Sequence, residues 1–201
     1  MKKHGVIFMA AMLLVFAGCS WLGLGEQNGG QGSRSQAVTG KVTISFTLSR
    51  ISGPGSNQYA VWIEDETGRY VRTLFVTDYM TRRQGWKVRK QSLMNWVRSV
   101  DLNSMPQQNI DAMSSATPQA GIQTVEWDLT DASGKTVNAG VYVYRIEACL
   151  LMENNVLWTG KIRVGGAGQT SQPAVSYYPK TAENLGRTLI SDISIVYEPS
   201  P

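Results

Sequence analysis

A strict alternation of apolar and polar residues after position 40 constrains the fold more than any other feature of this sequence. Val42, Ile44, Phe46 and Leu48 are separated by single threonine or serine residues. Successive side chains of a β-strand point to opposite faces of a sheet, so a period of two indicates a strand with one buried face. The chain beyond residue 40 therefore begins with a strand of a sheet that is covered on one side.

Several later segments have the composition of strands, because they are rich in β-branched and aromatic residues and are bounded by Gly, Asn or Pro. These segments are 59–63, 70–76, 124–129, 141–151, 156–164, 174–178 and 191–197. The acidic turn with Gly68 between the first two indicates a hairpin. We expect Trp62, Trp127 and Tyr142 to be buried, since each lies within an apolar strand.

One segment has a helical period instead. Leu93, Trp96, Val97 and Val100 follow the i, i+3, i+4, i+7 spacing of a single apolar helix face. We therefore predict one helix within residues 86–100, followed by a long connection over 101–121, a length at which loops often carry function. About eight strands and one helix predict a mainly β domain over residues 40–201, an immunoglobulin-like antiparallel β-sandwich with one inserted helix.

The first 18 residues have the pattern of a bacterial lipoprotein signal peptide. Lys2 and Lys3 precede an apolar run that ends in small residues before Cys19. The run is shorter than the roughly 20 residues of a membrane-spanning helix. We expect cleavage before Cys19 and attachment of acyl chains, palmitate among them, to this residue. The alternative is an ordinary secretory signal whose cleavage site contains a cysteine.

The residues after Cys19 indicate where the anchored protein resides. Ser20 follows the cysteine, and by resemblance to lipoprotein sorting in Gram-negative bacteria a residue other than Asp favours export to the outer membrane. We expect the protein on the periplasmic side of that membrane. Residues 19–39 are rich in Gly, Ser and Gln, a composition that predicts a flexible tether.

Composition argues against several classes of function. The net charge of +4 includes two lysines of the signal peptide, so the remaining charge does not indicate a nucleic-acid partner. The one histidine, His4, lies in the signal, whereas zinc and copper sites use His and Cys. Without histidine, no spaced motif supplies a base for a nucleophile. We predict no enzyme, no catalytic residue and no metal, and a buried, inert Cys149.

Three clusters allow alternative binding roles. Glu64, Asp65 and Glu66 offer oxygen ligands for calcium, although consecutive acids at a hairpin turn usually face solvent. A basic cluster around Trp86 suits anionic lipid head groups or an acidic partner, although such charge is usually only solvated; its members are Arg82, Arg83, Lys87, Arg89 and Lys90. A glycan- or peptide-binding sandwich would use exposed aromatic residues, for which the candidates are Trp158, Tyr177 and Tyr178.

The segment from Trp127 to Glu147 contains the sharpest local pattern. Asp131 to Gly134 reads as a turn in which the aspartate accepts hydrogen bonds from residues that follow it. The whole segment resembles the hairpin near the end of the immunoglobulin-like domain of flagellar hook-capping proteins, with Leu129 where that motif usually has Gly. This resemblance implies a fold and no flagellar function.

Several blocks together resemble the predicted periplasmic proteins of domain-of-unknown-function family 2271. The matching blocks, in order over residues 42–164, are 59–65, 71–74, the helix with Leu93 and Trp96, Asp111-Ala112 with Ala116-Thr117, and 127–147. Members have no established enzymatic activity and are found near PepSY-type membrane proteins and periplasmic FAD:protein FMN transferases. The resemblance implies a non-catalytic accessory module of an envelope redox or metal-responsive system, with an envelope protein as partner.

A rival hypothesis comes from the segment between Asp111 and Thr117. It resembles the acceptor motif of covalently flavinylated envelope proteins, Asp-x-x-Ser/Thr-Gly-Ala-Thr, in which the last Thr carries FMN as a phosphoester. Ser115 stands where the motif has Gly. The resemblance implies FMN on Thr117, exposed on a loop, in an electron-transfer module whose redox chemistry the flavin supplies. The alternative is a plain surface turn.

Overall fold

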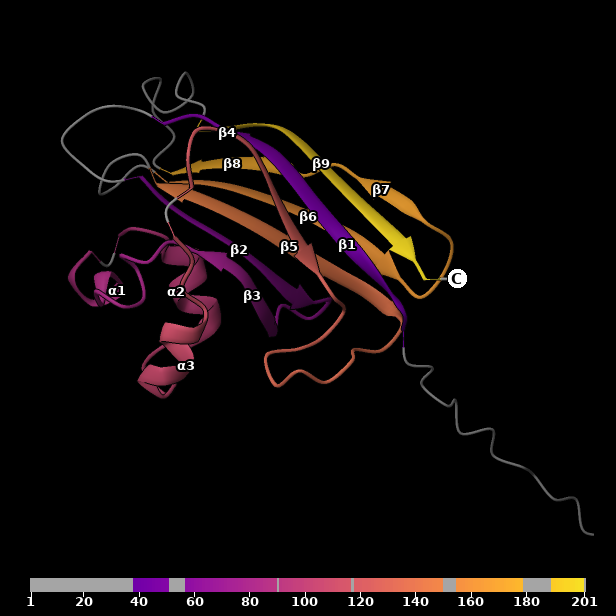
Figure 1. Ribbon diagram of the computed structural model, residues 1–201, viewed down its shortest axis with the longest axis horizontal. Coiled ribbons are helices and arrows are strands. Elements are labelled where there is room, and N and C mark those ends of the chain that lie inside the picture. The colour runs from indigo at the N-terminus through magenta and orange to yellow at the C-terminus, as the bar shows by residue number, and fades with distance from the viewer. Residues whose placement is uncertain are drawn as a thin grey trace, which may run out of the picture. The chain divides into compact units, whose positions relative to one another are not determined.

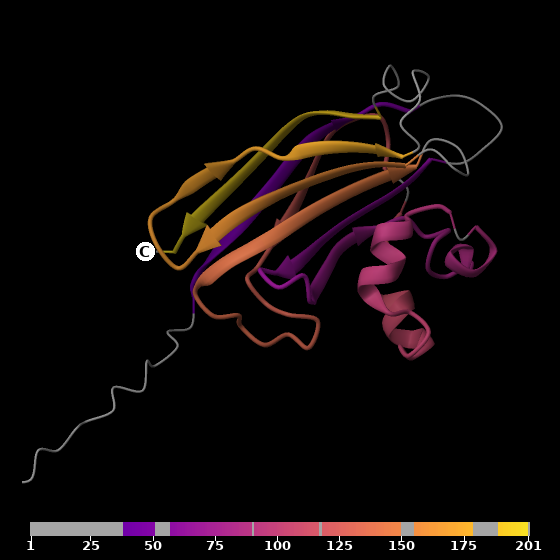
Figure 2. The same cartoon turned by 180° about the vertical axis from the view of Figure 1, so that it is seen from behind.

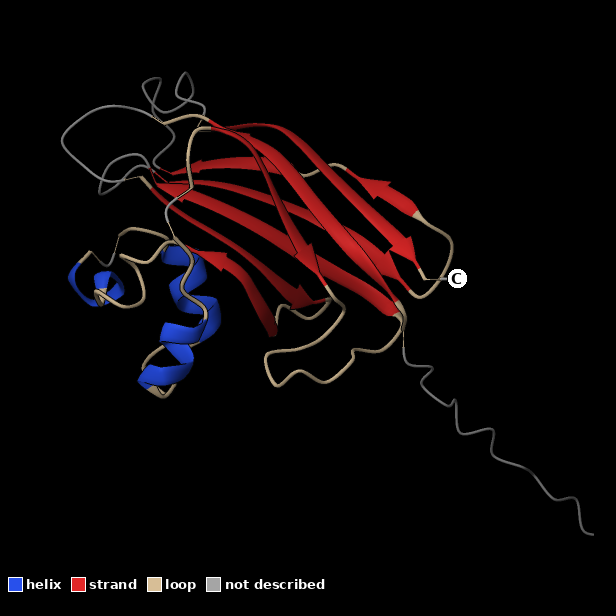
Figure 3. Ribbon diagram, in the orientation of Figure 1, coloured by secondary structure: helices blue, strands red, loops and turns tan. Residues whose placement is uncertain are grey.

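The computed structural model describes residues 38–50, 57–89, 91–116, 118–149, 155–178 and 189–200. These residues form two antiparallel sheets with the orders β4-β1-β9-β7 and β3-β2-β5-β6-β8, so the prediction of a mainly β sandwich is confirmed (Figure 1; Figure 3). The strands are β1 Gly40–Leu48, β2 Gln58–Asp65, β3 Tyr70–Val76, β4 Gly121–Trp127, β5 Gly140–Cys149, β6 Asn155–Val164, β7 Gln169–Ser171, β8 Ala174–Tyr178 and β9 Ile190–Pro199.

The strand order is that of an immunoglobulin core. The neighbours β1 and β4 correspond to strands B and E of that fold, and β3-β2-β5-β6 correspond to C′, C, F and G. The position of the first immunoglobulin strand, beside B, is taken here by β9 from the end of the chain, which pairs antiparallel with β1. Both views show the yellow β9 running along the indigo β1 (Figure 1; Figure 2). The last strand thus completes the sheet that the first one begins.

The sandwich core lies between the two sheets and follows the alternation in the sequence. The four apolar residues of β1 are buried, and the polar residues between them are half-buried or exposed. Trp127 and Tyr142 are also buried, as predicted, and their rings meet edge to face with centroids 5.0 Å apart. The Tyr142 hydroxyl donates to the Asn138 carbonyl oxygen at 2.9 Å, which is the tyrosine corner of immunoglobulin domains.

The turn between β4 and β5 contains a residue in an unusual conformation. Leu129 has a φ of 59°, a conformation that glycine adopts more readily than leucine. Its side chain is fully buried in the sandwich core, which offsets the backbone strain. Asp131 accepts hydrogen bonds from the amides of Ser133 and Lys135, and Gly134 has a φ of 82°, so the predicted turn is confirmed.

The prediction of a single helix and a helix-free connection is wrong. The structure has α1 Gly85–Val88, α2 Met94–Val100 and α3 Gln107–Ala112, the last within the predicted connection. Gln84 and Leu93, which precede α1 and α2, have positive φ values of 53° and 54°, so the chain turns before each helix instead of continuing one. The predicted apolar face exists, because Leu93, Trp96 and Val100 are buried.

The three helices pack on the outer face of the five-stranded sheet, beside β2 and β3 (Figure 1). They form a second hydrophobic cluster with Ala60 and Trp62 of β2, whereas Tyr59, Val61 and Ile63 of the same strand face the sandwich core. Being buried on both faces explains why β2 is continuously apolar and lacks the alternation of β1.

The signal peptide, Cys19 and most of the predicted tether lie outside the described residues. Val38, which the sequence assigned to the tether, is buried in the sandwich core, and the Thr39 carbonyl oxygen accepts a hydrogen bond from the Tyr197 hydroxyl. No helix within the described ranges is long and apolar enough to cross a membrane.

Candidate functional site

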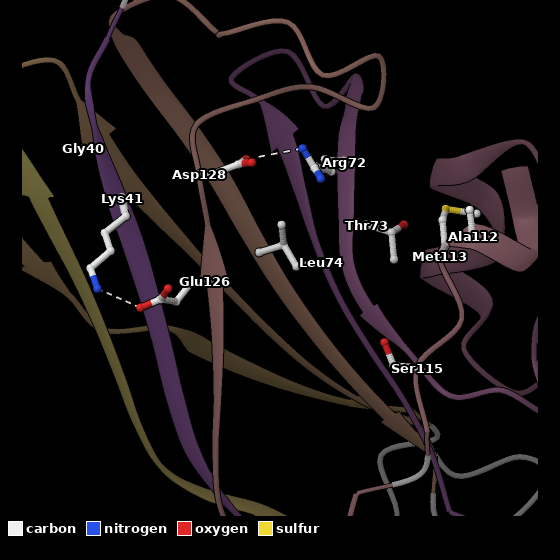
Figure 4. A pocket seen from close by; sticks show the side chains of 10 residues that line it. All are labelled: Gly40, Lys41, Arg72, Thr73, Leu74, Ala112, Met113, Ser115, Glu126 and Asp128. Atoms are coloured by element: carbon white, nitrogen blue, oxygen red, sulfur yellow. Dashed lines mark hydrogen bonds and ion pairs between the residues drawn. The ribbon is translucent and has the colours of Figure 1, made fainter.

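An open cavity of about 420 Å³ lies where β3 and β4, the edge strands of the two sheets, come close to the end of α3 (Figure 4). We call it the edge cavity. Its lining residues are Gly40, Lys41, Arg72, Thr73, Leu74, Ala112, Met113, Ser115, Glu126 and Asp128. A second cavity of about 430 Å³ shares Arg72, Thr73, Ala112 and Met113 with it and extends toward the turn at Ser133. The two cavities are therefore neighbours beside β3 and the end of α3.

Two ion pairs line the edge cavity. Lys41 Nζ lies 2.7 Å from Glu126 Oε1, and Arg72 Nη1 lies 3.3 Å from Asp128 Oδ1. The hydrogen bond with Glu126 raises the pKa of Lys41. Burial acts to raise the pKa of Asp128, but hydrogen bonds from Thr130 and the charge of Arg72 outweigh it and leave that pKa below its usual value. Both shifts favour the charged forms of Lys41 and Asp128, and the two ion pairs place both signs of charge in the cavity.

The backbone of β3 beside the cavity is covered at both ends. The Ser115 amide donates to the Val76 carbonyl oxygen at 2.9 Å, and the Ala132 amide donates to the Val71 carbonyl oxygen at 2.8 Å. The Thr73 amide donates to the Tyr70 hydroxyl at 2.7 Å. The pairing of β3 with β2 also contains two register shifts. Such contacts and irregularities protect an edge strand from pairing with another chain. The edge cavity therefore suits recognition by side chains better than strand addition.

The geometry of the edge cavity does not supply a catalytic pair. Each cation in its lining is already paired with a carboxylate, and the Thr73 hydroxyl accepts a hydrogen bond from Trp96 Nε1 at 3.0 Å. A nucleophile needs a base within hydrogen-bond reach, and no such contact is present among the described lining residues.

The proposed flavin acceptor, Thr117, lies outside the described residues. The residues before it are fixed in place. The Ser114 hydroxyl donates to Asp78 Oδ1 at 3.0 Å, and Asp111 accepts a hydrogen bond from Gln107 Nε2 at 2.9 Å. Ser115 forms a parallel bridge with Thr77 and contributes to the edge cavity. The motif segment therefore borders the cavity through Ala112, Met113 and Ser115.

The acidic residues at the first hairpin are held by hydrogen bonds within the protein. Glu64 is buried, contrary to the expectation of a solvated tip, and Arg145 Nε, Trp62 Nε1 and the Ser99 hydroxyl all donate to its carboxylate. Asp65 accepts hydrogen bonds from the Thr67 and Arg69 amides. No group of three or more His, Cys, Asp or Glu residues in the described ranges is placed to hold a metal ion.

The predicted basic cluster is divided. Arg82 and Arg83 each lie 3.6 Å from Asp78, Arg89 lies over the Tyr79 ring, and Lys90 is outside the described residues. Lys87 lies over the Trp86 ring, with its Nζ 4.9 Å from the ring centroid.

The aromatic residues proposed for a glycan- or peptide-binding face do not gather on one surface. Trp158 is only 7% exposed, so its assignment to such a face is wrong: its ring packs in the sandwich core. Tyr177 is half-buried against the same core, and Tyr178 is exposed. Cys149 is fully buried, as predicted.

Sequence reasoning identified only part of the edge cavity, namely Ala112, Met113 and Ser115 of the motif segment. It did not identify the charged residues. Lys41 and Glu126 occupy outward positions on β1 and β4, and Arg72 lies on β3, so nothing in the order of the chain brings them together. Only the pairing of β1 with β4 places Lys41 beside Glu126. Asp128 lies in segment 127–147, which the sequence singled out only for its fold.

Comparison with known proteins gives one match. A family model described as "Predicted periplasmic protein (DUF2271)" matches residues 40–178, more than half of the chain. No curated protein and no solved structure matches. The matched range ends before β9, the strand that pairs with β1.

Proposed function

Because this chain belongs to the DUF2271 family of predicted periplasmic proteins, we propose that it is a non-catalytic binding module of the cell envelope. In this proposal it engages an envelope protein partner through the edge cavity. The observation that carries the proposal is that two solvent-accessible ion pairs, Lys41–Glu126 and Arg72–Asp128, lie in one recess, whose described lining residues include no nucleophile paired with a base. Exposed ion pairs add little to stability, so their charges are available to select a partner.

A site-specific photocrosslinking experiment in cells tests this function. The crosslinking residue replaces Ala112, which is exposed and lines the edge cavity. The matched control carries the crosslinking residue at Val175, which is 45% exposed. Val175 lies on β8, at the edge of the five-stranded sheet opposite to β3. We expect one discrete envelope-protein adduct from position 112, absent from position 175 and weakened by the charge reversal Glu126→Lys. Equal adducts from both positions, or none from position 112, contradict the proposal.

We further propose that acylated Cys19 holds the module at the periplasmic face of the outer membrane. The basis is the signal pattern before Cys19 and the Ser20 that follows it. Labelling with a fatty-acid analogue and separation of the two membranes test this point. Cys19→Ala is expected to lose the label and the membrane attachment, whereas Cys149→Ser keeps both. Retained label in Cys19→Ala contradicts the anchor.

A second candidate function is a flavin-carrying module with FMN esterified to Thr117. The observation in its favour concerns Ser115, the departure from the acceptor motif. Its bridge with Thr77 gives this residue an extended backbone, which serine adopts without strain, so a glycine is not needed here. Ala116, directly before Thr117, is exposed. FMN would supply redox chemistry when bound, and the chain would position it.

Co-expression with a periplasmic FMN transferase tests this second candidate. We expect a flavin adduct in the intact mass and a visible flavin spectrum, both lost in Thr117→Ala and kept in Ser114→Ala. A colourless product of unmodified mass, under conditions that flavinylate a control protein, eliminates the candidate. Neither outcome depends on the edge cavity binding a partner.

A further inference from the structure

A separate cavity of about 550 Å³ lies between α1 and α2, and its volume is in the usual range for small-molecule sites. Its lining residues are Trp86, Lys87, Met94, Val97, Arg98 and Asn103. None of them lines the edge cavity. All of them come from the helix layer on the outer face of the five-stranded sheet.

The ionisable groups of this cavity carry one sign of charge. Lys87 and Arg98 are cations, and neither forms an ion pair with any residue that the structure describes. Lys87 donates to the Gln84 side-chain oxygen at 3.2 Å, a neutral acceptor. Arg98 has a longer-range electrostatic interaction with the buried carboxylate of Glu147. That carboxylate already accepts hydrogen bonds from the Asn95 and Trp96 amides. Two cations without a carboxylate partner favour an anion between them.

The Trp86 indole gives a second, independent indication. Its ring is only 6% exposed, and Nε1 is a buried donor without a hydrogen-bond partner in the described structure. Buried donors of this kind are rare in folded proteins and call for an explanation. Three of the other four indoles in the described core differ, because Nε1 of Trp62, Trp96 and Trp127 donates to Glu64, Thr73 and Thr130 respectively.

Met94 and Val97 add an apolar wall, and the ammonium of Lys87 covers the Trp86 ring at 4.9 Å. An anion that draws Lys87 to its own oxygen atoms uncovers that ring for an apolar group. We propose that this cavity binds an amphipathic organic anion. Its carboxylate or phosphate lies between Lys87 and Arg98, and its apolar body packs on Trp86, Met94 and Val97.

Indole ¹H–¹⁵N NMR spectra of the full chain carrying Cys19→Ala test the proposal. The probes are octyl phosphate, octanoate, inorganic phosphate and phosphatidylglycerol vesicles. We expect octyl phosphate or octanoate to shift the Trp86 indole signal in a saturable way, and to leave the signals of Trp62, Trp96 and Trp127 in place. Inorganic phosphate is expected to bind at least about tenfold more weakly, because it lacks the apolar body.

Variants locate the site. Lys87→Gln and Arg98→Gln are each expected to weaken octyl phosphate binding about tenfold, the loss typical of one charge-assisted hydrogen bond. Lys161→Gln, an exposed lysine of β6, is the matched control and is expected to change nothing. The proposal is overturned if neither soluble amphiphile shifts the Trp86 signal, if inorganic phosphate binds equally well, if the variants bind like the wild type, or if only the vesicles bind.

Discussion

The two faces of the five-stranded sheet are packed in different ways. On the inner face, apolar side chains of both sheets meet, with Trp127 against Tyr142 at the centre. On the outer face, the helix layer rests on apolar residues and also on buried polar groups. Glu147 of β5 is fully buried and accepts the amides of Asn95 and Trp96, at the start of α2. Glu64 of β2 accepts a hydrogen bond from Arg145 Nε at 2.7 Å and another from the Ser99 hydroxyl of α2 at 2.9 Å.

The two layers are specified by different kinds of interaction. Burial of apolar area is non-directional, so the alternation of β1 is enough to place its residues in the sandwich core. Hydrogen bonds to a buried carboxylate require particular partners at particular positions, and the turns before α1 and α2 have positive φ. Apolar burial thus specifies the sandwich, and the helix layer needs specific hydrogen bonds to Glu64 and Glu147 in addition to its apolar cluster.

The largest expected effect is on the sandwich. Trp127→Ala is expected to lower the free energy of unfolding by about 3 to 5 kcal/mol, because it leaves a cavity in a closely packed core. The matched variant in the helix layer, Trp96→Ala, is expected to release α2 while the sandwich stays folded. Urea unfolding followed by far-ultraviolet circular dichroism measures both. Unchanged unfolding of Trp127→Ala would contradict the role given to the inner layer.

A smaller effect is expected in the helix layer from Glu147→Ala. The change leaves the Asn95 and Trp96 amides without their acceptor, and unsatisfied buried donors cost about 1 to 3 kcal/mol. Urea titration of the variant beside the wild type measures the loss. A variant as stable as the wild type would mean that the polar contacts of this layer are dispensable.

The buried Glu147 carboxyl should also make the stability of the helix layer depend on pH. Burial raises the pKa of this carboxyl above its ordinary value of 4.5, against the hydrogen bonds from Trp96 and Asn95. The folded protein therefore binds the proton more tightly than the unfolded chain does. The free energy of unfolding of the wild type, measured relative to that of Glu147→Gln, is expected to be highest below about pH 4.5. It should fall as the pH rises toward the folded pKa of Glu147. A stability difference that is flat between pH 4 and pH 8 would contradict the raised pKa.

The smallest expected effect concerns the tyrosine corner. Tyr142→Phe removes the hydrogen bond to the Asn138 carbonyl oxygen and keeps the ring contact with Trp127, so a loss of about 0.5 to 1.5 kcal/mol is expected. Thermal unfolding measures it. A loss as large as that of Trp127→Ala would mean that this hydrogen bond, rather than apolar packing, holds the inner layer.

The sequence predicted the inner layer well, for a physical reason. Strand alternation and large aromatic residues report burial directly, and they identified β1, Trp127 and Tyr142. The outer layer was predicted only in part: the burial of Trp62, Leu93 and Trp96 was expected, and the buried carboxylate and the helix breaks were not. Glu147 follows an apolar residue in β5 and reads as an outward position, and only the packing of α2 on that face makes it buried. The breaks before α1 and α2 depend on backbone turns at Gln84 and Leu93, residues that carry no turn signal.

The candidate site shows the same limit. Asp131 was recognised as a turn residue because an aspartate bonds to the amides just after it, as Asp128 also does in the structure. The edge cavity combines β1, β3, β4 and α3, which lie far apart along the chain. Its ion pairs depend on strand register, and a single sequence does not reveal that register for polar outward positions.

Amide hydrogen exchange of the wild type and Glu147→Ala tests most directly whether the two layers are held by different contacts. The reporters are the Val97 amide of α2, which donates to the Leu93 carbonyl oxygen, and the Ile44 amide of β1. Local opening free energies differ between regions that are held independently. We expect Glu147→Ala to speed amide exchange at Val97 by about tenfold or more and to leave the exchange rate at Ile44 unchanged. An equal acceleration at both amides would show one cooperative unit and contradict the account.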